Sequence, residues 1–412
     1  MRVQRTLPPA AAPLTPGDLL HGLVAMTSDA AALRRREEEL RADFGSKHVF
    51  LVSSGKAALT LILRGLRRLR ARTDVLLPAY TCFSVPAAVE RSGLSVKLAD
   101  VDPETFDFDH DALDRSLDSG TLCVVAQHLF GIPADIERVR RSCDKVGAFL
   151  VEDAAQAMGS RSRAGVLGTL GDVGFFSLGR GKNITAGSGG VILTDSGPIA
   201  GALAAEYTGL DTPRITTTLG ELLRGVVMSL FIRPGLYWLP AGLPFLRLGE
   251  TRFDRDFPMR RMSGLNAGLL TNWRARLTRA NQIRAAGAAS FRARLGLLPV
   301  EGPRVPYLRL PVLMGSRAAR DRVYASALSR GLGASRMYPT PVNEIAEIRD
   351  RFTGQTFPSA KLIADTLLTL PTHHLVAERD RRALCDLLRR QEAPPALHPT
   401  RAPASLGAPT AP

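Results

Sequence analysis

The chain has 412 residues, of which 45% are hydrophobic and 23% charged, so it is long enough for two or three soluble globular domains. Its net charge of +15 comes mostly from arginine, yet the basic residues are scattered and aromatic residues make up only 6%. This pattern predicts a solvated, arginine-rich surface and argues against a nucleic-acid groove lined by stacking aromatics. No run of 18 uncharged apolar residues occurs, which argues against a membrane-spanning helix.

The cysteines and histidines point away from disulfides and metal sites. The pair His373 and His374 has no third ligand nearby in the sequence, so we expect no metal centre. The four cysteines form no CxxC pair, and we expect buried free thiols in a reducing compartment. They are Cys82, Cys123, Cys143 and Cys385.

The order of the elements predicts the fold class. Residues 1–16 are rich in Pro and Ala without an apolar signal segment, so we expect a flexible arm on a cytoplasmic protein. From 17 to 300, strand-like runs alternate with helical segments, which predicts an α/β large domain: a mostly parallel sheet covered on both faces, in three layers. We expect a smaller α+β C-terminal domain over 301–391 and a disordered tail over 392–412.

The predicted elements of the large domain follow in chain order. Strands are expected at 49–52, 75–77, 95–98, 122–126, 148–151, 173–176 and 190–194. Helices are expected at 30–44, 57–70, 85–92, 109–117, 134–146 and, with one break, 262–295. In the smaller domain we expect a strand at 307–313 and helices at 318–330 and 382–390.

Three residues at or after neighbouring strand ends carry the chemistry. Asp153 ends one buried strand, Ser177 ends the next, and Lys182 follows in a glycine-rich loop. Ligands of parallel sheets bind outside the carboxyl ends of the strands, which would bring these side chains together. An acid for a pyridinium nitrogen, a hydroxyl for phosphate and a lysine for a Schiff base are what pyridoxal phosphate requires. The alternatives are a helix-capping Asp153 and a solvated Lys182.

Two further segments fit this site less specifically. The turn at Gly55, Lys56 and Ala57 joins a strand to a helix, and its free backbone amides would suit a phosphate, although a Ser-Gly helix cap is common. Gln156, one turn after Asp153, could reach the ring oxygen. His128 follows another strand end, and we read it as structural rather than catalytic.

The segment over 221–248 is unusually apolar but is broken by Arg, Pro and Gly. We favour burial of this insert in a subunit or domain contact. The alternative is a weak, peripheral membrane contact in which Tyr237, Trp238 and Phe245 enter the interface, with arginines outside.

Together these motifs resemble the DegT/DnrJ/StrS family of sugar aminotransferases, a branch of fold-type I pyridoxal-phosphate enzymes. The resemblance is close over 49–194 and loose over 262–388. Its motifs are Ser54 to Leu59, Pro78 to Thr81, Val96 to Asp102, His128 to Gly131, Glu152 to Gln156, Phe176 to Asn183, Gly189-Gly190 and Tyr338-Pro339.

The resemblance implies roles for individual residues. Lys182 would be the Schiff-base lysine, Asp153 the pyridinium partner, Gln156 a ring-oxygen contact and Ser177 a phosphate ligand. Residues 55–57 would form the phosphate-binding turn. The family also implies a homodimer with active sites at the subunit interface.

Three positions depart from the family pattern. Lys56 stands where the family usually has Thr, and Cys82 stands where an aromatic residue usually stacks on the cofactor ring. Phe83 or Tyr80 could take over that stacking. Met259 occupies the place of a partner-chain Asn aimed at phosphate, so Arg260 or Arg261 could replace it.

We therefore expect a pyridoxal-phosphate-dependent transaminase that moves an amino group, from glutamate, to a keto-sugar, most simply a nucleotide-linked one, in surface-polysaccharide or secondary-metabolite biosynthesis. The alternatives are a family dehydratase, which Lys182 argues against because histidine replaces that lysine there, and a degenerate binding or regulatory homologue. A membrane-surface enzyme acting on a lipid-linked sugar is a further alternative.

Overall fold

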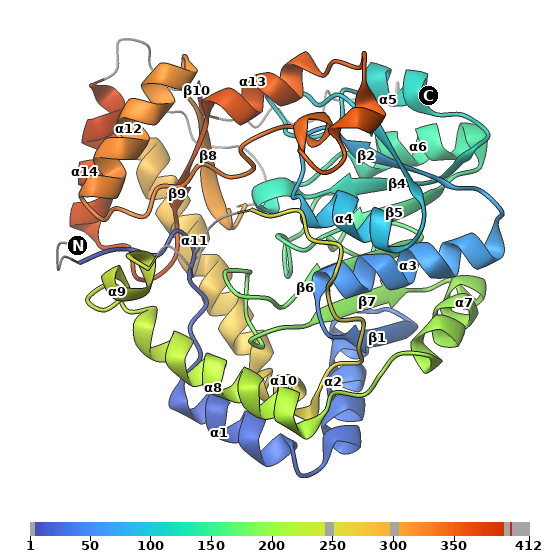
Figure 1. Ribbon diagram of the computed structural model, residues 1–412. Helices are drawn as coiled ribbons and strands as arrows, with labels where there is room; N and C mark the ends of the chain where they lie inside the picture. The colour runs from blue at the N-terminus through green and yellow to red at the C-terminus, as the bar shows by residue number, and fades with distance from the viewer. Residues whose placement is uncertain (1–4, 244–250, 297–304, 391–395, 398–412) are drawn as a thin grey trace, which may run out of the picture.

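A seven-stranded sheet forms the centre of the larger part of the molecule (Figure 1). The computed structural model describes residues 5–243, 251–296 and 305–390 and the backbone of Ala396 and Leu397. The strands are β1 (His48–Val52), β2 (Asp74–Pro78), β3 (Ser95–Ala99), β4 (Thr121–Gln127), β5 (Phe149–Asp153), β6 (Val173–Ser177) and β7 (Gly190–Thr194). Their order is β1-β7-β6-β5-β4-β2-β3, and only β7 runs antiparallel to its neighbours. The predicted mostly parallel sheet is confirmed.

The sheet is buried on both faces because its strands are apolar at successive positions. In β2, Val75 and Leu77 pack into one core cluster, whereas Leu76 between them packs into another on the opposite face. Fully burying one such side chain contributes about 1.5–3 kcal/mol. The helices around this sheet are α1 (Pro16–Ala25), α2 (Asp29–Phe44), α3 (Gly55–Leu69), α4 (Ser84–Arg91), α5 (His110–Ser116), α6 (Ile136–Val146), α7 (Gly197–Thr208), α8 (Ile215–Phe231), α9 (Trp238–Ala241), α10 (Gly264–Leu269) and α11 (Trp273–Arg294), with the 3-10 turn η1 (Leu129–Gly131).

A second, antiparallel sheet lies beside the first in the C-terminal part (Figure 1). Its strands are β8 (Arg309–Leu313), β9 (Leu367–Pro371) and β10 (Ala396–Leu397), in the order β10-β8-β9. Helices α12 (Arg317–Ser329), α13 (Pro358–Thr366) and α14 (Glu378–Arg389) and the 3-10 turns η3 (Val342–Glu344) and η4 (Arg349–Phe352) accompany it. The small α+β unit is confirmed. β10 falls within the tail over 392–412 that we expected to be disordered. The other residues of that tail lie outside the described part.

The N-terminal segment differs from the flexible arm expected over 1–16. Its described residues are packed: Leu7 is 1% exposed and Ala11 2% exposed. The Thr6 amide donates to the Pro234 carbonyl, and the Leu7 amide donates to that of Gly331, each at 2.8 Å. Arg5 pairs with Asp380 at 2.6 Å. The segment therefore fastens the start of the chain to elements made much later.

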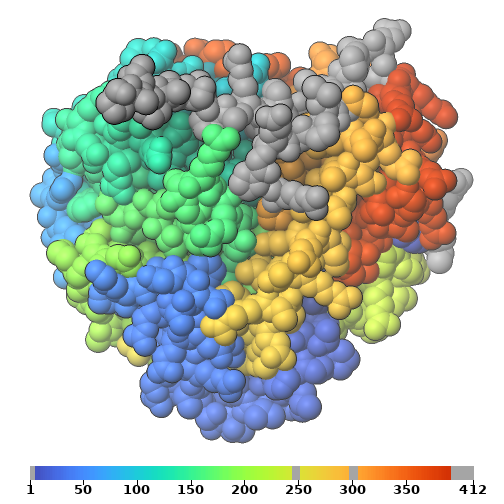
Figure 2. All heavy atoms as spheres, turned by 180° about the vertical axis from the view of Figure 1, so that it is seen from behind, coloured from blue at the N-terminus to red at the C-terminus, as the bar shows by residue number. Residues whose placement is uncertain are grey.

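Helix α11 connects the two parts of the molecule. Seen from behind, its gold surface lies between the green elements of the large sheet and the red C-terminal elements (Figure 2). The long helix expected over 262–295 is broken at Asn272, whose φ of 56° is left-handed, into α10 and α11. Every third or fourth residue of α11 is buried, which turns one side of the helix toward the loop that carries Lys182.

The apolar insert folds as α8 and α9, while residues 244–250, including Phe245, lie outside the described part. No helix among the described residues is long and apolar enough to cross a bilayer. Of the cysteines, Cys123, Cys143 and Cys385 are buried and Cys82 is half-buried. Burial raises the pKa of the Cys143 thiol to about 12.

Candidate active site

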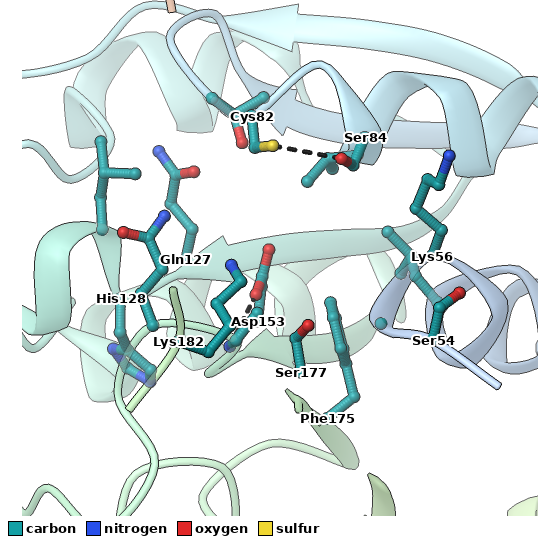
Figure 3. A pocket seen from close by; sticks show the side chains of 17 residues that line it. Ser54, Lys56, Cys82, Ser84, Gln127, His128, Asp153, Phe175, Ser177 and Lys182 are labelled. Atoms are coloured by element: carbon teal, nitrogen blue, oxygen red, sulfur yellow. Dashed lines mark hydrogen bonds between the residues drawn. The ribbon is translucent and has the colours of Figure 1, made fainter. Parts of the chain in front are cut away.

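A cavity of about 210 Å³ lies at the carboxyl ends of β4, β5 and β6, beside the first turn of α3 (Figure 3). This is the edge of the sheet at which ligands of parallel sheets bind. The lining residues are Ser54, Gly55, Lys56, Leu59, Thr81, Cys82, Ser84, Val85, Gln127, His128, Leu129, Asp153, Ala155, Gln156, Phe175, Ser177 and Lys182.

The three residues singled out by the sequence all line this cavity. Asp153 ends β5 and Ser177 ends β6, and these neighbouring strands are paired in parallel. Lys182 comes from the loop after β6, and its side chain lies next to that of Asp153 (Figure 3). Two adjacent strands and the loop that follows the second therefore bring an acid, a hydroxyl and an amine into one space.

Asp153 is held in a fixed orientation at the base of the cavity. Its Oδ1 accepts the amide hydrogen of Ala155 at 3.0 Å, and its own carbonyl accepts that of His128 at 3.0 Å. Burial raises the pKa of the Asp153 carboxyl above its ordinary value, while the positive charge of Lys182 acts in the opposite direction. A carboxylate in such surroundings gains from a cation placed against it.

The loop of Lys182 is fixed from behind by a buried arginine on α11. The guanidinium of Arg284 is 2% exposed and donates to the carbonyls of Asn183 at 2.8 Å and Lys182 at 3.0 Å. The Asn183 side chain donates to Asn281 of the same helix at 3.1 Å. Burial lowers the pKa of Arg284 to about 10. Sequence reasoning missed Arg284, although its spacing from Leu277 and Asn281 on one helical face was a usable signal.

The first turn of α3 closes the cavity on the Ser177 side. Ser54 caps this helix by accepting the Ala57 amide hydrogen at 3.1 Å. A Cβ at Gly55 would stand 2.9 Å from the Ser177 Cβ and 3.0 Å from its Oγ, so only glycine permits this approach. The helix start and the Ser177 hydroxyl thus face the same space, as a phosphate would need. Ala57 belongs to this turn but is fully buried.

Lys56 also lines the cavity, but its ammonium group is engaged elsewhere. Its Nζ donates to Asp254 at 3.0 Å and lies 4.5 Å from the centre of the Phe257 ring. In Figure 3 its side chain points away from Lys182 and Asp153. The phosphate pairing considered from the sequence would require Lys56 to leave Asp254.

Gln156 lies at the opposite wall, and its amide is already bonded on both sides. Its oxygen accepts the Phe130 amide hydrogen at 3.2 Å, and its nitrogen donates to the Tyr338 hydroxyl at 2.9 Å. Tyr338 has a left-handed φ of 49° and is 2% exposed. Gln156 therefore has one free N–H to offer to a ligand, and Tyr338 is a supporting residue that sequence reasoning left without a role.

Neither Tyr80 nor Phe83, the residues suggested to stack on the cofactor ring in place of an aromatic at Cys82, lines the cavity. The Tyr80 hydroxyl donates instead to the Met337 carbonyl at 2.6 Å. Cys82 itself lines the cavity, and its Sγ lies 3.2 Å from the Ser84 Oγ. The aromatic residue that does reach the cavity is Phe175, which alternates with Ser177 on β6 and so shares its face.

His128 lines the cavity but is bonded into the core. It is 1% exposed, its Nδ1 accepts the Ala134 amide hydrogen at 3.0 Å, and its Nε2 bonds to Glu152 at 2.7 Å. This agrees with the structural reading. Arg260 and Arg261 do not line the cavity of their own chain; their side chains donate to Thr217 and to the Thr208 carbonyl, respectively.

Known proteins share both the sequence pattern and the fold. The chain is 30% identical over 171 residues to GDP-perosamine synthase of Vibrio cholerae, covering 42% of this chain and 46% of that protein. It is 35% identical over 147 residues to an L-glutamine:2-deoxy-scyllo-inosose aminotransferase of Streptomyces kanamyceticus, covering 36% of this chain and 34% of that protein. These matches span less than half the length of the curated relatives.

Solved structures match over nearly the whole chain. PseC of Helicobacter pylori, an aminotransferase of pseudaminic acid biosynthesis, superposes with a TM-score of 0.75 at 16% identity, over 93% of this chain and 98% of its own. DesI in the presence of its TDP-sugar product gives 0.73 at 23% identity, over 94% and 92%. At these identities the likeness establishes the fold.

The family model extends over the elements that build the cavity's acid, hydroxyl and lysine. Residues 25–225 match the DegT/DnrJ/EryC1/StrS aminotransferase family. Over residues 25–225, just under half of its length, this chain therefore belongs to that aminotransferase family, and its fold matches that of solved sugar aminotransferases.

Proposed function

We propose that this chain binds pyridoxal phosphate and transfers an amino group to a keto-sugar, with Lys182 and Asp153 as its catalytic residues. The observation that carries the proposal is the meeting of these two side chains in one cavity at the strand ends. Their charges are opposite, they come from adjacent segments, and the loop bearing the lysine is fixed by Arg284.

The residues of the cavity fit the cofactor. Asp153 offers a buried carboxylate to a protonated ring nitrogen, which would offset the unfavourable burial of its charge. Ser177 and the first turn of α3 offer a hydroxyl and backbone amides to the phosphate. Gln156 offers one N–H to a ring oxygen. Leu59 and Val85 add apolar surface to the lining.

When bound, pyridoxal phosphate would supply an electron sink for amino-group transfer. The Nζ of Lys182 would first hold the cofactor and, once displaced by the donor amine, accept the proton from the donor Cα. Asp153 would keep the ring nitrogen protonated. Ser177, together with the Gly55 turn, would hold the phosphate and so keep the reacting carbon within reach of Lys182.

The substrate we propose is a nucleotide-linked keto-sugar, with glutamate as the donor. In support, one relative is named for a GDP-sugar product, and one structural neighbour was solved with a TDP-sugar product. The net charge of +15 would attract a diphosphate. Because two relatives are named for L-glutamine, glutamine is the donor to compare with glutamate.

We further propose a homodimer that shares its active sites. Within one chain the side chains of Arg260 and Arg261 lie outside the cavity, although the Arg260 backbone is bonded to Ser53 at its edge. The test mixes two inactive chains: Lys182→Ala and a variant in which Arg260 or Arg261, the residues proposed to reach the partner's phosphate, is replaced. If active sites are shared, the mixed dimer should regain activity. A mixture that stays inactive would contradict the proposal that the two chains share their active sites.

The decisive experiment is an absorption spectrum of the purified protein titrated with pyridoxal phosphate. The wild type should develop a visible band that Lys182→Ala lacks, and single-turnover reaction with glutamate should bleach it. A panel of keto-sugars would then be tested for return of the band. Lys145→Ala, a lysine on α6 remote from the cavity, is the matched control. A wild type without a band, or a band that survives in Lys182→Ala, would show that the proposal is wrong.

A further inference from the structure

The outer sides of α1 and α8 expose apolar side chains to an unusual extent. Among the described residues, 11 of the 14 exposed large hydrophobic side chains lie within 20–24 or 215–239. Monomeric proteins seldom expose so many apolar groups together. We define the α1–α8 face by nine of them: Leu20, Leu23, Val24, Ile215, Leu219, Leu223, Val226, Val227 and Leu230.

The two helices lie side by side (Figure 1). The exposed fractions of the nine side chains show that this face points outward. The inner side of α8 is marked by the buried residues Thr218 and Gly225, and a Cβ at Gly225 would stand 3.5 Å from the Leu19 side chain of α1. At 3.6 residues per turn, the six α8 members of the face fall within an arc of roughly 120°. Their exposure ranges from 44% at Val227 to 65% at Leu223.

The exposed charges along α8 have one sign, while the exposed acids Asp29 and Asp211 lie after the end of α1 and before the start of α8. Between residues 214 and 243 the charged residues are Arg214, Arg224, Arg233 and Glu221. All three arginines are exposed. Glu221 is half-buried; burial raises the pKa of its carboxyl, and the neighbouring Asn266 of α10 acts in the opposite direction. The exposed charges on α8 and its C-terminal flank are all cationic, as in a helix that lies in the interface of an anionic bilayer.

We propose that the α1–α8 face docks on an anionic lipid surface, with the aliphatic side chains in the headgroup–acyl boundary and the arginines against lipid phosphates. The α8 helix would lie in the plane of the surface, consistent with the absence of a spanning helix among the described residues. Leu236 and Leu239, 38% and 37% exposed, extend the apolar surface beyond the end of α8.

A lipid surface fits this face better than a second copy of the chain does. In a two-fold interface the same patch meets itself, so the arginines of both copies would border one contact to which α8 contributes no exposed acid. On a lipid surface, the phosphate groups would instead neutralise these arginines. Tyr237, which the sequence suggested would enter the membrane, does not belong to the face: burial raises the pKa of its hydroxyl, and it lies near Arg309.

Vesicle flotation of the full chain tests the proposal directly. Wild type should float with phosphatidylcholine vesicles containing phosphatidylglycerol, and less with pure phosphatidylcholine or at high salt. The pair Leu219→Glu with Leu223→Glu should lower the partition coefficient at least tenfold. The matched control pair is Leu328→Glu with Leu362→Glu, two leucines 58% and 50% exposed on α12 and α13.

The variants are compared only after thermal unfolding has shown that each folds. If the α8 pair does not fold, Leu20→Glu with Val24→Glu on α1 replaces it, with the same expected loss. The proposal is overturned if wild type stays unbound with both vesicle types, or if the control pair loses as much binding as the α8 pair. It is equally overturned if the α8 pair dissociates an oligomer of unbound wild type, since the face is then a protein interface.

Discussion

The Nε2 atom of His128 lies 2.7 Å from Oε1 of Glu152, and both side chains are fully buried beneath the cavity. Because the Ala134 amide donates to Nδ1, the neutral ring carries its proton on Nε2 and donates it to Glu152. Glu152 also accepts amide hydrogens from Gly168, Leu170 and Gly171. These hydrogen bonds fix the side chain of Glu152, the residue directly before Asp153.

Glu152→Gln should destabilise the protein by about 3–5 kcal/mol at neutral pH, because an amide cannot accept from all of these donors. Although burial alone would raise it, His128 and the amides hold the pKa of Glu152 below its ordinary value. Its stabilising effect is therefore present above pH 4.5 and is lost as pH falls through the lower, folded-state pKa. Urea unfolding at several pH values checks this, with the exposed Glu347→Gln as control. Equal stability of the two variants would contradict the assignment.

Arg284→Met should lower kcat by about 10²-fold, because the loop of Lys182 loses the donor that fixes two of its carbonyls. The carbonyls left without a donor should also cost about 1–3 kcal/mol of stability. Activity, the cofactor absorption band and the unfolding midpoint are measured together. Arg279→Met, an exposed position on the same helix, should change none of them. A variant that is destabilised but keeps the wild-type kcat would limit Arg284 to a structural role.

Gly55→Ala should weaken cofactor binding about tenfold or more, since the added methyl meets Ser177 at 2.9 Å and forces the phosphate turn away from it. Titration of the visible band with pyridoxal phosphate gives the affinity. The control is Gly201→Ala in α7, where a Cβ would meet nothing within 4 Å. Unchanged affinity in Gly55→Ala would place the phosphate elsewhere.

His373→Gln should make the protein less sensitive to mild acid. Burial lowers the pKa of His373 to about 3, and its Nε2 donates to the Pro8 carbonyl at 2.9 Å. Because the folded-state pKa of this histidine lies below its unfolded value near 6.5, its burial is compatible with folding above pH 6.5. As pH falls from 6.5 toward 3, the unfolded state takes up the proton first, and the free energy of unfolding decreases. Between pH 7 and 5 the wild type should therefore lose about 2 kcal/mol more than His373→Gln. If the free energies of unfolding of wild type and His373→Gln fall in parallel with pH, the pKa of His373 is not lowered by folding.

The strands of the large sheet were predictable because each is a short apolar run bounded by polar or glycine residues. Thus 49–52 and 173–176 became β1 and β6 with ends shifted by only one residue. Helix α1 was not predicted, although Thr15 and Asp18 form a capping box at its start and Pro16 opens the helix. Strand β9 was also missed, since its pairing with β8 joins residues more than fifty positions apart.

The candidate site was predictable as far as strand ends determine it. Asp153 and Ser177 end adjacent strands, so the sheet alone places them together. What surrounds them depends on packing between distant segments. Arg284 reaches the Lys182 loop from α11, and Tyr80 is drawn away from the cavity by the Met337 carbonyl. Neither contact follows from local sequence.

The packed N-terminal segment has a consequence for how the protein is made. The Leu7 amide meets Gly331, the Pro8 carbonyl meets His373, and the Ala11 carbonyl meets Arg284, which also holds Lys182. The contacts of Leu7 and Pro8 therefore cannot form until residues as far along the chain as Gly331 and His373 have been synthesised. The support of the Lys182 loop likewise has to wait for Arg284, 102 residues further along the chain.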